Sequence, residues 1–189
     1  MSSGTSAGSS SKANARWRSA CRNASRRWRR TSPGSRTRGG VVVWGHNEHF
    51  GRTPHLVYGA ATKSTGAYLA EAFGDRYFAI GSTVFEGTFW AVQYSSGTGF
   101  IREQTMEPAS PSDIATYFHA ASLPELFVPL RGRIPSWLIA PRTIRIAGSN
   151  VQSPRRATVT FTLELAKKFD AMVYVERSTP THLRHFPSR

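Results

Sequence analysis

The chain has 189 residues and a formal net charge of +14, a length that suits one domain of ordinary size. Its one cysteine, Cys21, excludes an internal disulfide and every multi-cysteine metal site. No apolar run approaches the roughly 18 residues that a membrane span needs, and the first residues lack the apolar core of a secretory signal. We therefore expect a soluble, cytoplasmic protein.

The positive charge is concentrated at the start of the chain. Residues 1–40 contain Lys12 and nine arginines but no acidic residue, which leaves 15 basic and 11 acidic residues, a net charge of +4, for the rest. We predict a disordered Ser/Arg-rich basic arm over residues 1–39. It could be an organellar targeting sequence, an arm that binds nucleic acid or membrane, non-native sequence, or a solvated tail. We expect no specific nucleic-acid site in the folded domain.

The first predicted element is a short buried strand at Val41–Trp44. This β-branched and aromatic run is bounded by Gly40 and Gly45. A helix is predicted over residues 63–73, capped by Ser64 or Thr65, and a second buried strand over residues 77–81. Because strand, loop, helix and strand follow in order, residues 41–81 are predicted to form one parallel crossover unit.

The remaining elements are expected in alternation. A turn at Glu86-Gly87 is predicted to lead into a third strand over residues 89–94, and residues 95–111 read as an excursion or a hairpin. Asp113 is predicted to start a helix that ends near residue 121, with Ile114, Tyr117 and Phe118 facing inward. The later segments are an apolar stretch over 125–130, irregular chain over 135–150, a strand or helix over 161–168, a strand over 169–175 and a polar loop over 176–181.

This alternation of helices and buried strands predicts an α/β fold with a largely parallel sheet and flanking helices. A complete doubly wound domain normally contains more crossover units than the one that is clear here. We therefore expect an incomplete portion of a larger three-layer α/β domain.

Three stretches carry a resemblance to a known family. They are residues 41–52, with the core Trp-Gly-His-Asn-Glu-His, then residues 65–77, and finally residues 169–179. Together they resemble the carboxyl-terminal part of the erythromycin esterase family over about residues 40–186. We expect residues 40–186 to be a partial domain of this kind, because the family's earlier segment, with another histidine and acidic partners, has no counterpart in residues 1–40.

The resemblance implies a hydrolase that cleaves a carboxylic ester or a macrolactone, as in the inactivation of macrolide antibiotics, with water activated by a histidine. No cofactor is implied, and the expected partner is a small ester or lactone substrate. Two hypotheses from other classes remain. One is a non-catalytic module that binds nucleic acid or anionic membrane through the arm, and the other is an unrelated α/β enzyme that holds a metal.

The residues favoured for catalysis are His46 and His49, which follow the first predicted strand. An imidazole can accept a proton from water near neutral pH, and it can equally hydrogen-bond a developing oxyanion, so the spacing leaves both roles open. Asn47 is predicted to set the loop geometry, and Arg52 to bind a carboxylate product or a site carboxylate.

Two acidic residues complete the predicted site. Glu86 follows the second predicted strand, and Glu176 follows the last one, where it could orient His46 or His49. Zinc sites use at least three protein ligands, and no motif fixes Glu48, Glu86 or Glu176 as a third ligand beside the two histidines. We therefore predict no metal. Ser82 and Ser178 are not expected to be nucleophiles, because neither stands in a Gly-x-Ser-x-Gly elbow.

Overall fold

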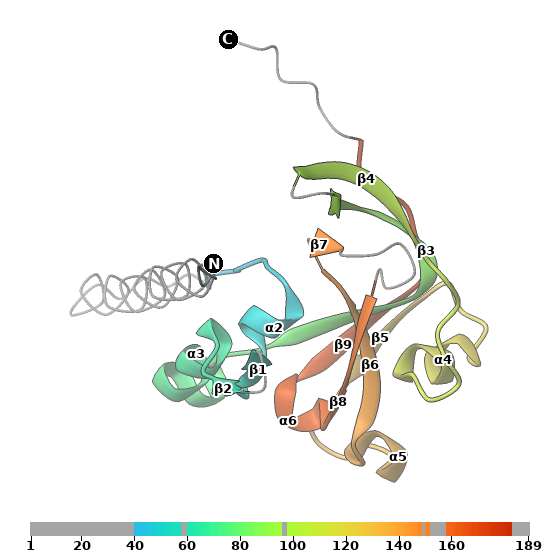
Figure 1. The fold of residues 1–189 in the computed structure, drawn as a ribbon. Coiled ribbons are helices and arrows are strands. Elements are labelled where there is room, and N and C mark those ends of the chain that lie inside the picture. The colour runs from blue at the N-terminus through green and yellow to red at the C-terminus, as the bar shows by residue number, and fades with distance from the viewer. Residues whose placement is uncertain (1–39, 58–59, 96–97, 149, 152–157, 183–189) are drawn as a thin grey trace, which may run out of the picture.

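The computed structural model describes residues 40–57, 60–95, 98–148, 150–151 and 158–182 (Figure 1). The predicted arm over residues 1–39 lies outside this part of the chain. Within it, no helix is long and apolar enough to cross a membrane.

The helical elements are short, and most lie between strands. They are α2 (Asn47–Phe50), α3 (Thr65–Phe73), η1 (Gly74–Arg76), α4 (Ile114–His119), α5 (Ser136–Ile139) and α6 (Leu165–Lys168). The strands are β1 (His55–Val57), β2 (Ala60–Thr62), β3 (Ile80–Ser95), β4 (Thr98–Met106), β5 (Glu125–Pro129), β6 (Arg142–Ala147), β7 (Asn150–Val151), β8 (Thr158–Leu163) and β9 (Ala171–Ser178).

The central sheet is mixed, so the prediction of a largely parallel sheet was wrong in that respect. Its strand order is β4-β3-β9-β5, with β7 also paired to β3. Strands β9 and β7 run parallel to β3, whereas β4 and β5 pair antiparallel with β3 and β9. Within segment 95–111, predicted as an excursion or a hairpin, β4 pairs antiparallel with β3 as the second strand of a hairpin.

Strand β3 runs through the predicted turn and third strand but contains only the last two residues of the strand predicted over 77–81, and that strand was wrongly predicted to be buried, since Phe78 and Ile80 are 49% and 52% exposed. The chain stays extended through Glu86-Gly87, where Gly87 has a φ of 132° and opposes Ser178 on β9. A Cβ at Gly87 would lie 2.2 Å from the Ser178 carbonyl oxygen, so glycine permits a close approach of two strands here. The glycine that suggested a turn marks a distortion within one long strand.

The predicted strand at Val41–Trp44 does not form. Residues 40–46 have no regular secondary structure, and the four apolar side chains are 63%, 93%, 51% and 95% exposed. A β-strand needs a neighbour to satisfy its backbone groups, and no described strand pairs with this segment. Without its first strand, the predicted crossover unit over residues 41–81 is also absent.

Ser64, one of the two caps predicted for the first helix, is confirmed, and the second predicted helix begins directly after Asp113 as expected. The Ser64 side chain accepts a hydrogen bond from the Ala67 amide at the start of α3, and Gly74 ends that helix with a positive φ. Asp113 caps α4 in the same way, by accepting from the Ala115 amide at 2.9 Å. The prediction that Tyr117 faces inward was wrong. Its side chain is 41% exposed and stacks on Trp137.

Two later segments contain more regular structure than was predicted for them. Residues 135–150 were predicted to be irregular, but they contain α5, β6 and the first residue of β7. Residues 161–168, predicted as strand or helix, contain the end of β8 followed by α6. The predicted strand over 169–175 forms as β9, and it extends into the predicted polar loop.

One main core lies between the central sheet, helix α4, the β6–β8 pair and the α5 and α6 turns (Figure 1). Its largest fully buried residues include Tyr174, Phe169, Ile114, Ile144, Leu165 and Met172. Figure 1 also shows α2, α3 and the β1–β2 pair gathered where β3 begins, with the β3–β4 hairpin extending away from them.

Candidate functional site

His46 caps the four-residue helix α2. Its backbone is extended, and its Nδ1 accepts a hydrogen bond from the Glu48 amide at 3.3 Å. Its Nε2 lies 3.2 Å from the carbonyl oxygen of Ala147 on β6. The two contacts of the ring thus join α2 to β6.

Asn47 binds the edge of β3 in the manner of a neighbouring strand. Its Nδ2 donates to the Ser82 carbonyl at 2.6 Å, and its Oδ1 accepts from the Ser82 amide at 3.0 Å. Strand β4 pairs with β3 only from Gly87 onward, so no described strand lies beside this part of the edge. Farther along, the Val84 carbonyl accepts from the Arg145 guanidinium at 3.0 Å. Side chains thus satisfy the backbone groups that a strand would otherwise pair.

His49 lies next to His46, with the two ring centroids 5.8 Å apart and tilted by 59°. Burial lowers the pKa of His49 below its ordinary value, and the neighbouring His46 lowers it further, while the charge of Glu48 acts in the opposite direction. His49 is therefore neutral near pH 7, which is the form that can accept a proton.

A buried ion pair connects α2 to the far end of the chain. The Lys168 Nζ, on a residue only 4% exposed, lies 2.8 Å from the Glu48 Oε1. The Lys168 carbonyl also accepts from the Arg52 amide at 2.8 Å. A Cβ at Gly51 would lie 2.7 Å from the Lys168 side chain, so the lysine packs directly over this glycine. Helix α2 is thereby held against α6.

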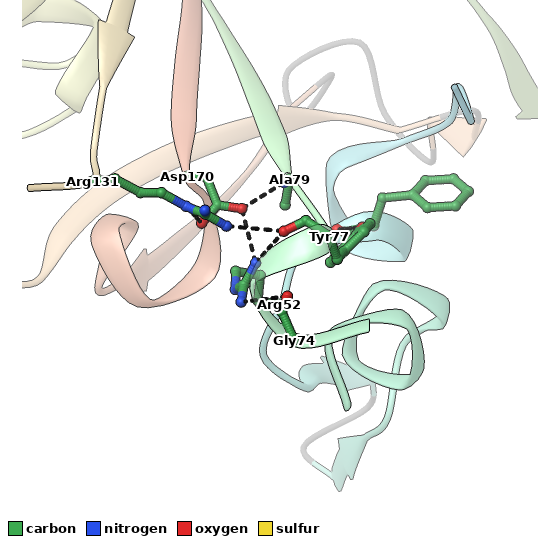
Figure 2. Close-up of polar contacts among 7 residues, drawn as sticks. Arg52, Gly74, Tyr77, Ala79, Arg131 and Asp170 are labelled. Carbon is green, nitrogen blue, oxygen red and sulfur yellow. Dashed lines mark hydrogen bonds and ion pairs between the residues drawn. The ribbon is translucent and has the colours of Figure 1, made fainter. Parts of the chain in front are cut away.

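Arg52 binds a carboxylate, one of the two roles considered for it, but that carboxylate is a residue of the protein (Figure 2). Its Nη1 lies 3.0 Å from the Asp170 Oδ2 and 2.6 Å from the Tyr77 carbonyl oxygen. Asp170 directly precedes β9, and its Oδ2 also accepts from the Ala79 amide at 2.6 Å. The contact ties the segment after α2 to the beginning of both parallel strands.

A second arginine completes this cluster. The Arg131 Nε donates to the Asp170 Oδ1 at 2.6 Å, and its Nη2 donates to the Tyr77 carbonyl at 2.9 Å. Burial alone would raise the pKa of Asp170, but the bonds from Arg131 and the Ala79 amide and the charges of both arginines hold it below its usual value. Asp170 is thus a buried, charged hub.

The two predicted glutamates lie elsewhere. Glu86 on β3 forms an ion pair with Arg177 on β9. The Glu176 carboxylate is bound by His119, whose Nδ1 lies 2.8 Å and 3.0 Å from its two oxygens, and by the hydroxyl of Tyr174, which donates to Oε2. These bonds, first that from Tyr174 and then that from His119, lower the pKa of Glu176. The His119 ring stacks on Phe85 with centroids 3.9 Å apart.

The structure therefore separates the predicted site residues into two groups. His46, Asn47, His49 and Arg52 lie together around α2, beside the first residues of β3. Glu86 and Glu176 lie farther along β3 and near the end of β9, and the carboxylate of Glu176 is hydrogen-bonded to His119 and Tyr174. We expected Glu176 to orient one of the paired histidines, but its carboxylate orients His119. Among the described residues, no three metal-ligating side chains are grouped.

Sequence reasoning missed four residues in these clusters, namely Lys168, Asp170, Arg131 and His119. Asp170 precedes a confidently predicted strand, and a charged residue between apolar ones was a signal that it needs buried partners. Lys168, Arg131 and His119 have no local pattern that distinguishes them from surface residues. Their partners lie between 39 and 120 positions away in the chain.

Comparisons with known proteins give one family and a partial structural match. The family model described as erythromycin esterase matches residues 4–178, a range that includes most of the predicted arm. No curated protein matches the chain.

Three solved structures are similar to parts of this chain. A crystal structure of a Bacillus cereus protein has a TM-score of 0.62 and 26% identity, and it covers 75% of this chain and 34% of that one. A crystal structure of a succinoglycan biosynthesis protein has a TM-score of 0.63, 22% identity and the same two coverages. A mutant of the erythromycin esterase EreC in its open conformation has a TM-score of 0.48 and 20% identity, with coverages of 70% and 30%. The chain spans about a third of the length of these structures.

Proposed function

The chain belongs to the erythromycin esterase family, and we propose that it acts in the hydrolysis of a carboxylic ester or a macrolactone, macrolide antibiotics included. The family match supports the assignment of the chain as a hydrolase. The choice of reacting group depends on the two imidazoles at α2, because an imidazole can activate water directly as a general base.

His49 is the proposed general base. The lowered pKa keeps its imidazole neutral at pH 7, ready to take a proton from water. The water oxygen then bonds to the carbonyl carbon, the bond to the alcohol oxygen breaks, and the imidazolium returns its proton to the departing alkoxide. The products are a carboxylic acid and an alcohol.

His46 and Asn47 are proposed as positioning residues. Both His46 ring nitrogens have partners in the protein, the Glu48 amide and the Ala147 carbonyl, so the ring holds the start of α2. Asn47 fixes the same helix to β3. Arg52 acts one step farther away, because its guanidinium is bound to Asp170 rather than aimed at His49. Glu86 and Glu176, placed apart from these histidines, are less suited to bind the same substrate.

Hydrolysis of p-nitrophenyl acetate and of erythromycin by the purified chain tests the proposal. Both activities should be present in the natural chain and fall by roughly 10²- to 10⁴-fold in His49→Asn, the usual contribution of a general base. Activity should decline on the acid side with a midpoint below the ordinary histidine pKa of about 6.5, because protonated His49 cannot accept a proton.

The matched control is His182→Asn, which changes an exposed histidine near the end of the described chain. It should hydrolyse both esters at the natural rate. Equal activity in His49→Asn and His182→Asn would remove His49 from the reaction, and the absence of hydrolysis in the natural chain would count against the activity itself.

A further inference from the structure

The ion pair between Glu48 and Lys168 belongs to the helix that carries the proposed base. Glu48 directly precedes His49 in α2, and Lys168 is the last residue of α6. The two side chains are only 14% and 5% exposed, and the Lys168 Nζ lies 2.8 Å from the Glu48 Oε1. Withdrawing two charges from water costs about as much as their attraction returns, so fold stability alone does not account for such a pair.

Lys168 fixes the position of α2 through more than its charge. Its carbonyl accepts a hydrogen bond from the Arg52 amide at 2.8 Å, and its methylene chain covers Gly51, where a Cβ would lie 2.7 Å from it. On the other side of the pair, the Glu48 amide donates to the His46 Nδ1 at 3.3 Å. The backbone and the carboxylate of Glu48 thus connect the paired imidazoles to α6.

The charge of Glu48 opposes the proposed role of His49. A negative charge beside an imidazole favours the protonated form, which cannot accept a proton from water. Burial and the neighbouring His46 lower the pKa of His49, and Glu48 is the group that raises it. Lys168 places a positive charge 2.8 Å from that carboxylate, so the field at His49 is that of a neutral pair rather than of a bare anion.

The other ionisable groups on the elements around α2 are engaged elsewhere. The acidic residue of α3, Glu71, is paired with Lys63, and that of β3, Glu86, with Arg177. The Tyr77 hydroxyl donates to a backbone carbonyl at the end of α2, and it is neutral because burial raises its pKa. In the part of the chain that the structure describes, the compensating charge for Glu48 is therefore that of Lys168.

We propose that Glu48 and Lys168 act as a positioning pair for His49, in which Glu48 ties α2 to α6 and Lys168 neutralises its charge, so that the imidazole stays ready to accept a proton. The inference rests on the proposed function, because it assigns His49 as the general base. Neither member of the pair is assigned a contact with the reacting atoms, so both are positioning residues.

Titration of the His49 ring by NMR in the full chain tests the inference, with the ring signals assigned through His49→Asn. Glu48→Gln leaves the lysine charge and should move the His49 midpoint down by about one pH unit, whereas Lys168→Met leaves the glutamate charge and should move it up by about as much. The double variant Glu48→Gln/Lys168→Met is again neutral and should return close to the natural midpoint. The acid limb of ester hydrolysis should follow each midpoint.

The matched control is Lys167→Met, which removes the same charge from the preceding residue of α6, where the side chain is 68% exposed and paired with Glu164. It should leave the His49 midpoint in place. Unchanged midpoints in both single variants, or shifts in the same direction, would overturn the proposal. Lower activity with an unchanged pH profile would also overturn it, because a merely structural role gives that result.

Two further outcomes are decided by the same measurements. If Lys168→Met does not fold, Glu48→Gln must still lower the His49 midpoint and the double variant must restore it, and failure of either would overturn the inference. The NMR titration does not depend on turnover. Opposite shifts in a chain that hydrolyses neither ester would therefore support the action of the pair on His49 while removing the proposed reaction.

Discussion

Two apolar runs of this chain have similar local character and opposite structures. Val41–Trp44 is β-branched and aromatic, yet more than half of each side chain is exposed. In β9, Ala171, Met172 and Tyr174 are fully buried. The difference is that β9 lies between β3 and β5, whereas no described strand lies beside Val41–Trp44. Apolar, β-prone sequence gives a strand only where neighbouring strands exist to pair with it.

The anchor at the start of β9 should give the largest effect on stability. Asp170→Asn removes the charge that Arg52 and Arg131 share at a buried position, so the free energy of unfolding should fall by roughly 4 kcal/mol. Urea denaturation at pH 7 measures it. Asp75→Asn, at an exposed aspartate of η1, is the control and should change stability little.

The stability of the natural chain and that of Asp170→Asn should also differ in their dependence on pH. The folded-state pKa of Asp170 is below its unfolded value of about 3.9, so its contribution is complete above that pH and is lost as the pH falls through the folded-state pKa. The natural chain should lose stability steeply below about pH 4, and Asp170→Asn less steeply. Parallel pH curves for the two would show that Asp170 is not the charged hub.

Truncating matched apolar side chains tests the comparison directly. Met172→Ala leaves a cavity beside fully buried neighbours and should cost roughly 3 kcal/mol. Val42→Ala removes methyl groups that already face water and should change stability by less than about 0.5 kcal/mol. Urea denaturation of both variants under one condition is sufficient. Similar losses would mean that Val42 is buried in solution.

The Asn47 side chain takes the place of a neighbouring strand at the β3 edge. Changing it should have an intermediate effect on stability. Asn47→Asp keeps an acceptor for the Ser82 amide but removes the donor to the Ser82 carbonyl, at a cost of roughly 1–2 kcal/mol. Thermal unfolding and hydrogen exchange of the Ser82 amide report on it. Exchange as slow as in the natural chain, with no loss of stability, would show that α2 does not need the amide group.

The smallest effect should come from the end of β9. The pKa of Glu176 is lowered, so its bonds to Tyr174 and His119 stabilise the fold above an unfolded pKa of about 4.3 and fade as the pH falls through the folded-state value. Glu176→Gln should reduce stability at pH 7 by less than about 1 kcal/mol, because the pair is partly exposed. Thermal unfolding from pH 3 to 7 measures this, with the exposed Glu103→Gln as control.

Local signals in the sequence were sufficient for several elements. Ser64 was one of the two residues predicted to cap α3, and Asp113 was predicted to lie at the start of α4, because a helix start depends on a side chain and an amide two or three residues apart. The prediction of a turn at Glu86-Gly87 was wrong, because a glycine with positive φ also permits two strands to approach closely. That is the role of Gly87 beside Ser178. The sequence showed where a glycine was needed and left its geometry open.

In the candidate site, too, local contacts were predictable from the sequence and distant ones were not. The neighbours His46 and His49 were predicted to act together, and the helix between them brings their rings to 5.8 Å. The partners of Arg52 and Glu176 were not predictable, because Asp170 and His119 lie 118 and 57 positions away. Which cation meets which carboxylate depends on how the elements pack.

The sequence by itself determined the family, the mixture of helices and strands, the starts of α3 and α4 and the identity of β9, because each depends on motifs or on contacts within a few residues. Only the tertiary structure decided strand direction, the partners of Asp170 and Glu176, and the exposure of Val41–Trp44. These properties depend on which distant segments lie side by side, and a strand or a buried charge is stable only when such a neighbour is present.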